Sequence, residues 1–128
     1  MSRTNKNRQF ILNYYQTVSG SEKTEVLMKQ FTTDSKLIEH VLFFEKLFPK
    51  YELLTDEITT EGDRVIIQGR KKGKHTGKIK GVPPTNKTVE IPFAIGYRVE
   101  NQKIINHWFV TDQMELLEQL GLVKTAEQ

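Results

Sequence analysis

A strand pair near the C-terminal end is the sequence feature that most constrains the fold. From residue 88 to residue 100, every second position is apolar or aromatic: Val89, Ile91, Phe93, Ile95, Tyr97 and Val99. That period of two is typical of a long strand with one buried face. Asn101-Gln102 predicts a hairpin turn, and residues 103–111 predict the returning strand. Pro92 has no amide hydrogen to donate, so its end of the strand should lie at a sheet edge or a bulge.

The rest of the chain supplies helices first and then strands. Apolar residues at helical spacing predict helices over residues 10–17, 22–31, 35–48 and 113–120. Pro49 ends the third of these and Gly121 ends the last. Two further strands are predicted over residues 51–60 and 64–76, with a tight turn at Glu61-Gly-Asp63 between them. This order predicts an α+β domain with helices on one face of an antiparallel sheet.

Composition limits the classes of protein that remain. A length of 128 residues predicts one domain over residues 1–128, with an ordered core of about residues 8–122. No apolar run is long enough to span a membrane, and the N-terminal residues lack the apolar segment of a secretory signal. The chain has no cysteine, which excludes disulfides, thiol nucleophiles and cysteine-ligated metals. We therefore expect a cytoplasmic protein.

The net charge of +3 has a local origin. Residues 70–80 carry six Lys or Arg and no carboxylate. Such a run either meets phosphates or forms a solvated strand edge, where lysines discourage edge-to-edge pairing. The run has no aromatic residue on which a base would stack, so we favour the solvated edge and expect neither nucleic acid nor membrane as a partner.

The period-two rule also assigns side chains to sheet faces. In the second strand one face carries Val65, Ile67, Gly69, Lys71, Gly73 and His75. In the last strand, one face carries Ile104, Asn106, Trp108 and Val110, and the other carries Ile105, His107 and Phe109. Both faces of the last strand are largely apolar, so one should meet the helices and the other a partner subunit. We predict a homodimer through the sheet.

Residues 34–121 resemble the SnoaL-like polyketide cyclase (ester cyclase) family of the nuclear-transport-factor-two-like superfamily. The matching elements are His40…Phe48-Pro49, Glu61-Gly-Asp-Arg-Val65, His75-Thr-Gly…Gly81-Val-Pro-Pro-Thr85, Tyr97-Arg-Val99, Lys103-Ile104, His107-Trp108, Asp112 and Gln119-Leu-Gly121. Asn86 stands where the family usually has glycine, and asparagine tolerates the same left-handed backbone. Residues before 35 match poorly, so substrate identity does not transfer.

The resemblance implies a cone-shaped, curved antiparallel sheet wrapped around N-terminal helices, which is a cystatin-like roll. It also implies a pocket at the wide end of the cone and a dimer packed through the sheets. Members of the family close rings by an intramolecular aldol reaction without metal or cofactor. They use a carboxylate that follows the last-strand tryptophan, and that role maps onto Asp112.

Two residues are the predicted catalytic groups, and each has a structural alternative. Asp112 would abstract a proton from carbon if an apolar cavity raised its proton affinity, or it would cap the final helix. His75 would donate to a substrate carbonyl or enolate oxygen, or it would simply be solvated at a strand end.

The predicted ligand contacts are Trp108, His40, Tyr14, Tyr97 and Phe93. Tyr15 is an equal alternative to Tyr14, and His40 has an alternative as a core histidine. His107 is out of phase with Trp108 and should face the other side of the sheet. Three histidines at positions 40, 75 and 107 form no local metal-ligand pattern, so we expect no metal and no cofactor.

Two functions remain open. The first is a cofactor-independent aldol cyclase, isomerase or hydratase that acts by acid/base chemistry on a small, largely apolar carbonyl compound. The second is a non-catalytic ligand-binding or structural dimer with the same fold.

Overall fold

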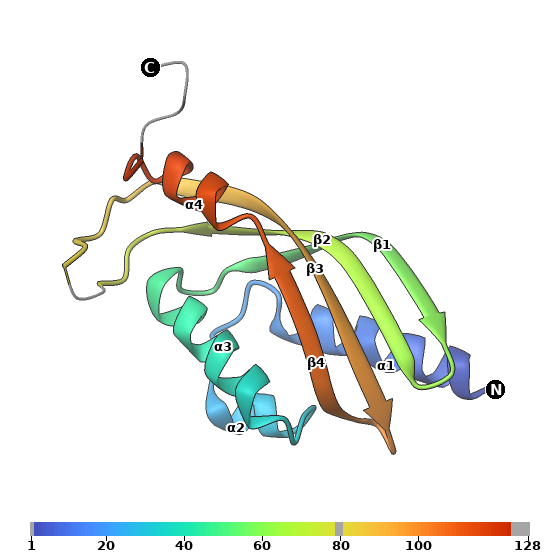
Figure 1. Ribbon diagram of the computed structural model, residues 1–128. Coiled ribbons are helices and arrows are strands. Elements are labelled where there is room, and N and C mark those ends of the chain that lie inside the picture. Colours follow the sequence, from blue (N-terminus) through green and yellow to red (C-terminus); the bar gives the residue numbers. More distant parts are fainter. Residues whose placement is uncertain (1, 79–80, 124–128) are drawn as a thin grey trace.

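The computed structural model describes residues 2–78 and 81–123, which form a layer of helices against one curved sheet (Figure 1). The elements are α1 (Arg3–Val18), α2 (Glu25–Lys29), α3 (Ser35–Leu47), β1 (Glu52–Glu61), β2 (Arg64–Lys74), β3 (Thr88–Glu100), β4 (Lys103–Thr111) and α4 (Gln113–Gln119). The predicted α+β class is confirmed. None of the helices in these residues is both long and apolar enough to cross a membrane.

Side-chain caps fix where the helices begin. Ser2 accepts the amide hydrogen of Asn5 at the start of α1, and Asp34 accepts those of Lys36 and Leu37 at the start of α3. Helix α1 starts well before the predicted residue 10. Its first turns are polar and carry no apolar period, and of residues 3–9 only Asn7 is buried.

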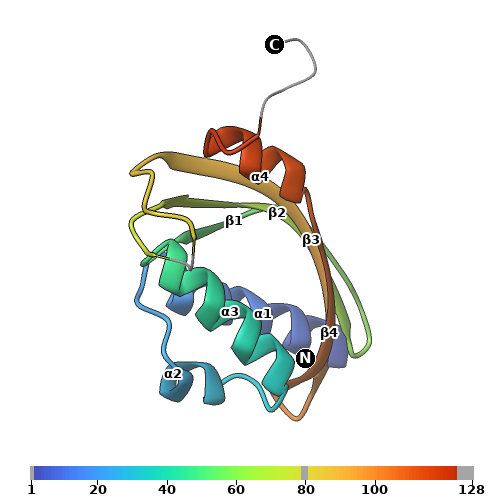
Figure 2. The same cartoon turned by 60° about the vertical axis from the view of Figure 1, so that its left-hand side comes forward.

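The sheet is an antiparallel meander in the order β1-β2-β3-β4. The sheet curves around α1 and α3, which lie on its concave side, as Figure 1 and Figure 2 show from two directions. Asn101 and Gln102 have φ values of 50° and 56°, as a type I′ turn between right-twisted strands requires. The predicted hairpin is confirmed.

Pro92 lies where β3 is an edge. Strand β4 pairs with β3 only from Phe93 onward, so residues 88–92 have a strand partner on the β2 side alone. The side-chain amide of Gln119 bonds to both the N–H and the C=O of Glu90, at 2.9 and 3.0 Å. Helix α4 therefore covers the edge that Pro92 predicts.

A bulge corrects the predicted faces of the last strand. Val99 pairs with Ile104 and Arg98 pairs with Asn106, so Ile105 is an extra residue on β4. Ile104 consequently joins the core, and the prediction that it shares a face with Trp108 is wrong. From His107 onward the predicted alternation holds.

The part of the basic run that lies in β2, residues 70–74, is not a solvated sheet edge, and residues 79–80 of the run lie outside the described residues. Strand β2 lies between β1 and β3, and Arg70 forms ion pairs with Asp56 and Glu90 on those neighbouring strands. Lys71 and His75 are buried on the concave side, as the period-two rule predicts. The loop after His75 contains Asn86 with a φ of 59°, which is the left-handed backbone expected there.

Candidate functional site

Among the residues that the structure describes, Lys71 is a buried charged side chain without a carboxylate partner. It follows Val65, Ile67 and Gly69 on the inward face of β2, and only 4% of its surface is exposed. Its ammonium group lies 4.4 Å from the ring centres of both Phe44 and Phe109. Within the described part of the chain, no carboxylate forms an ion pair with it.

The nearest polar partner of Lys71 is a histidine from α3. Nζ of Lys71 and Nε2 of His40 are 3.2 Å apart, and the His40 ring packs edge-on against Phe109. Burial, and to a lesser extent the charge of Lys23, lowers the pKa of Lys71 to about 7. Burial, followed by the charges of Lys71 and His107, lowers the pKa of His40 to about 4. At neutral pH the imidazole is therefore uncharged, and the lysine is close to its own titration point.

A second polar pair joins β4 to the start of α3. Nδ1 of His107 lies 2.6 Å from Oδ2 of Asp34, and only 12% and 11% of the two side chains are exposed. The other oxygen of Asp34 caps α3, so the carboxylate is held from two sides. Because Nδ1 donates to Asp34, Nε2 of His107 is the nitrogen left to accept a proton. Asp34, His40, Lys71 and His107 are called the concave cluster below.

Of the aromatic residues predicted to contact a ligand, Phe93 lies beside the concave cluster, whereas Tyr14 and Tyr97 lie deeper in the core. Phe93 packs against Phe109 and its ring centre lies 5.9 Å from Nζ of Lys71. Tyr97 is the cross-strand neighbour of His107, but its hydroxyl bonds to that of Tyr15 at 2.8 Å. Tyr14 is fully buried and packs edge-on against Tyr15 and Tyr97. Burial raises the pKa of all three tyrosines, so they stay neutral.

Asp112 and Trp108 lie away from the concave cluster. Oδ1 of Asp112 accepts the amide hydrogen of Glu115 at 2.9 Å, so this exposed residue is the N-cap of α4. Trp108 is 49% exposed on the outer face of the sheet and lies over Gly96, where even a methyl group would clash with its indole. An open hollow of about 920 Å³ on that side is bordered by residues including Gln68, Val110 and Asp112.

His75 holds a loop rather than facing Asp112. Only 2% of its surface is exposed, and Nδ1 accepts the amide hydrogen of Thr85 at 3.2 Å. Its ring packs against Phe48 at 5.3 Å between centres. The described residues show no contact between His75 and Asp112, so the structure does not bring the two predicted catalytic groups together.

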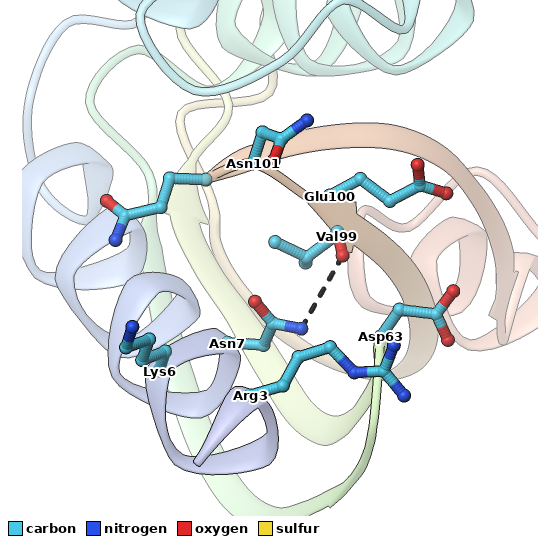
Figure 3. A pocket seen from close by; sticks show the side chains of 8 residues that line it. Arg3, Lys6, Asn7, Asp63, Val99, Glu100 and Asn101 are labelled. Carbon is cyan, nitrogen blue, oxygen red and sulfur yellow. Dashed lines mark hydrogen bonds between the residues drawn. The ribbon is translucent and has the colours of Figure 1, made fainter. Parts of the chain in front are cut away.

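Another hollow lies where α1 begins and the two hairpins turn (Figure 3). It measures about 660 Å³ and is bordered mainly by polar and charged side chains, which include Arg3, Asp63 and Glu100. The side-chain amide of Asn7 donates to the carbonyls of Gly62 and Val99, and so ties α1 to both hairpins. The residues around this hollow therefore hold α1 against the two hairpins. Its border is polar, unlike the apolar pocket expected for this fold.

Sequence reasoning placed Lys71 and His107 on the correct faces but chose neither as a site residue. The available signal was a lysine at an inward position of an otherwise apolar strand face. Asp34 was not among the predicted site residues. Its pairing with His107 joins residues 73 positions apart, which no local pattern reveals. No three His, Asp or Glu side chains in residues 2–78 and 81–123 gather closely enough to hold a metal ion.

Solved structures with the same fold are numerous at low sequence identity. AclR from Streptomyces galilaeus superposes with a TM-score of 0.81 at 21% identity, over 96% of this chain and 85% of that one. A SnoaL-like protein from Jannaschia sp. CCS1 gives 0.81 at 18% identity, over 97% of each chain. The phenazine biosynthesis-related protein PhzB2 from Pseudomonas aeruginosa gives 0.71 at 17% identity, over 96% and 90%. These likenesses show the fold.

A sequence-family model adds evidence that structural likeness alone does not give. Comparison with curated protein sequences gives no match. The family model of the SnoaL-like polyketide cyclases matches residues 28–120, which is most of the chain and includes every member of the concave cluster. The chain therefore belongs to the SnoaL-like polyketide cyclase family.

Proposed function

We propose that this protein is an enzyme that acts by acid/base chemistry, without a cofactor, on a small and largely apolar carbonyl compound. Aldol cyclisation, isomerisation and hydration all fit such a site. The observation that carries the proposal is the hydrogen bond between Lys71 and His40 inside an aromatic cage. A lysine buried in this way costs stability, and such a cost is common where a group serves chemistry.

Each polar group of the concave cluster has a chemical role in this proposal. The ammonium form of Lys71 donates to the carbonyl oxygen and stabilises the enolate that develops there. Nε2 of His107 removes the proton from the adjacent carbon, because its other nitrogen is held by Asp34. Asp34 then stabilises the imidazolium that forms. His40 contacts Lys71, and its pKa is lowered first by burial and then by the charges of Lys71 and His107, so it lies within electrostatic range of both.

The surroundings of Lys71 favour an apolar substrate. Phe44, Phe93 and Phe109 all lie within 6 Å of Nζ. These rings offer no hydrogen bond to a polar substituent, which would lose its hydration there without replacement. An uncharged ketone or aldehyde avoids that cost and offers one oxygen for the single ammonium group.

Proton exchange on a simple ketone tests the proposal without knowledge of the natural substrate. Deuterium incorporation into cyclohexanone at pH 7 is followed by NMR for the natural protein and for Lys71→Met, His107→Gln and Asp112→Asn. We expect exchange to depend on Lys71 and His107 and to survive in Asp112→Asn. Loss in Asp112→Asn with retention in Lys71→Met would make Asp112 the base instead. Cyclohexanone exchange no faster than in buffer would count against the enzyme proposal.

A second candidate function has its own supporting observation. Ile66 on β2 and Trp108 and Val110 on β4 are exposed together on the outer face of the sheet. Exposed apolar side chains of this size favour a sheet-to-sheet homodimer, which would serve a ligand-binding or structural protein as well as an enzyme. If ketone exchange is absent while the protein is dimeric in solution, this non-catalytic function becomes the better one.

A further inference from the structure

Two lysines are buried in the described part of the chain, and they are held in opposite ways. Lys23 donates to the carbonyls of Ser21 and Tyr51 and pairs with Glu45 at 3.3 Å, so all of its hydrogens have acceptors. Lys71 has one nitrogen acceptor, His40, and otherwise faces aromatic rings. Three acceptors hold an ammonium ion, whereas a single imidazole in an apolar cage favours the uncharged amine.

We propose that Nζ of Lys71 is a nucleophile that forms an imine with a small, uncharged aldehyde or ketone. This inference rests on the proposed function and changes the role of Lys71 in it from hydrogen-bond donor to covalent catalyst. The geometry that carries it is the contact between Nζ and Nε2 of His40, with no carboxylate on Nζ among the described residues.

The reaction balances without any added oxidant or reductant. The Nζ lone pair attacks the carbonyl carbon, the C–N bond forms, and the π electrons move to the oxygen. One proton passes from nitrogen to that oxygen through His40, which gives a carbinolamine. The C–O bond then breaks, the nitrogen lone pair forms the C=N bond, and the second nitrogen proton leaves with the oxygen as water. The imine takes up a proton, and its positive charge acidifies the adjacent carbon for His107.

His40 suits a proton relay at this place. Its side chain is only half-buried, whereas the amine next to it is almost wholly buried. The groups around Lys71 come from five parts of the chain. They are His40 and Phe44 from α3, Tyr51 before β1, Phe93 from β3, Phe109 from β4, and Lys23 before α2. Neither tyrosine nor lysine in this set supplies a negative charge at neutral pH, so the amine stays available as a nucleophile.

Reductive trapping tests the proposal directly. The full chain is incubated at pH 7 with propanal and sodium cyanoborohydride, and peptide mapping measures the adduct at each lysine over time. Because the uncharged fraction of an amine rises about tenfold for each unit by which its pKa falls, we expect Lys71 to react at least about tenfold faster than Lys72. Lys72 is the matched control, since it is the next residue on β2 and is exposed on the opposite face.

Three variants make the result decisive. Lys71→Met and Lys71→Arg should both lose the fast adduct while keeping the natural circular dichroism spectrum, and Lys72→Met should keep it. Lys23 should stay unlabelled, because it is buried like Lys71 but its hydrogens are held by three acceptors. The comparison therefore separates the effect of the aromatic surroundings from that of burial alone. Labelling of Lys71 no faster than that of Lys72 in the folded protein would overturn the proposal.

The two proposals fail in different ways. If propanal leaves Lys71 unmodified but His107-dependent exchange on cyclohexanone persists, the acid/base function stands and only the covalent step is wrong. If Lys71 is trapped but no exchange occurs, the lysine is nucleophilic in a protein that does not use it for proton abstraction, and the inference holds while the proposed function fails.

Discussion

Two groups of residues on and next to β4 have side chains suited to carbonyl chemistry, but they lie on opposite faces of the sheet. At the C-terminal end of β4 Trp108 and Asp112 face outward, and the carboxylate makes the hydrogen bond that a helix cap needs. One residue before Trp108, His107 faces inward to meet Asp34, and Phe109 on the same face contacts the buried Lys71. The outer residues include Asp112, the carboxylate to which the resemblance gives the catalytic role, whereas the concave cluster contains the buried lysine.

The contrast shows how a structural polar group differs from a candidate functional one. The bond of Asp112 satisfies an amide hydrogen at the start of α4 and stabilises the protein. Lys71 satisfies no helix end or turn, and its burial opposes folding. A group that costs stability and has no structural partner is the stronger candidate for chemistry.

The largest effect should come from removing the lysine. Lys71→Met takes away the donor to the carbonyl oxygen, and we expect the exchange rate on cyclohexanone to fall by about 10²–10³-fold. Methionine fills a similar volume and needs no hydrogen bond, so the fold should persist. NMR exchange rates together with circular dichroism spectra check this. An unchanged rate would remove the concave cluster from consideration.

Removing the proposed base should have the next largest effect. His107→Gln keeps a side chain that can bond to Asp34 but cannot take up a proton at neutral pH, so we expect a loss of about 10²-fold in exchange. Trp108→Phe is the matched control, because it changes the neighbouring residue on the outer face. Equal losses in the two variants would indicate a structural effect on β4.

Stability should depend on pH through the same lysine. The pKa of Lys71 is 10.5 when exposed and about 7 in the fold, so between these values the unfolded chain binds more protons. The free energy of unfolding should therefore rise as pH increases from 7 towards 10.5, by about 5 kcal/mol from this group. Urea titrations at several pH values measure the rise, and it should be absent in Lys71→Met, which should also be the more stable protein at pH 7.

Because of His40, the folded protein should lose stability as the pH falls, by the same reasoning. Its pKa falls from 6.5 when exposed to about 4 in the fold, so the unfolded chain binds more protons between those values. The free energy of unfolding should fall as pH drops from 6.5 to 4, by about 3 kcal/mol from this group. His40→Asn should show a weaker fall over that interval in urea titrations, and an identical slope would contradict the assignment.

Trp108, on the outer face of the sheet, should be needed for dimer formation. Trp108→Glu places a charge on the exposed sheet face, and we expect a dimer measured by light scattering to become a monomer. Val26→Glu is the control, because Val26 is an exposed apolar residue on α2, away from the sheet. A natural protein that is monomeric at micromolar concentration would contradict the dimer.

The smallest effect should come from Asp112. Asp112→Ala removes the cap of α4 and should cost about 1 kcal/mol of stability, whereas Asp112→Asn should cost less because asparagine also caps well. Thermal denaturation compares the two. A fall in exchange rate in Asp112→Asn without loss of stability would restore the family-derived role of this carboxylate.

The amino-acid sequence determined the element order, the two hairpins, the edge at Pro92 and the inward phase of β2, since each depends on residues close together in the chain. It also determined that His107 and Trp108 face opposite ways. Tertiary structure decided the rest. The bulge at Ile105 depends on how β4 pairs with β3, so the sequence could not show that Ile104 turns inward. The pairing of Asp34 with His107, and of His40 with Lys71, joins segments 73 and 31 residues apart. Burial, charge and pKa at those positions depend on what the other segment brings, which only the folded chain settles.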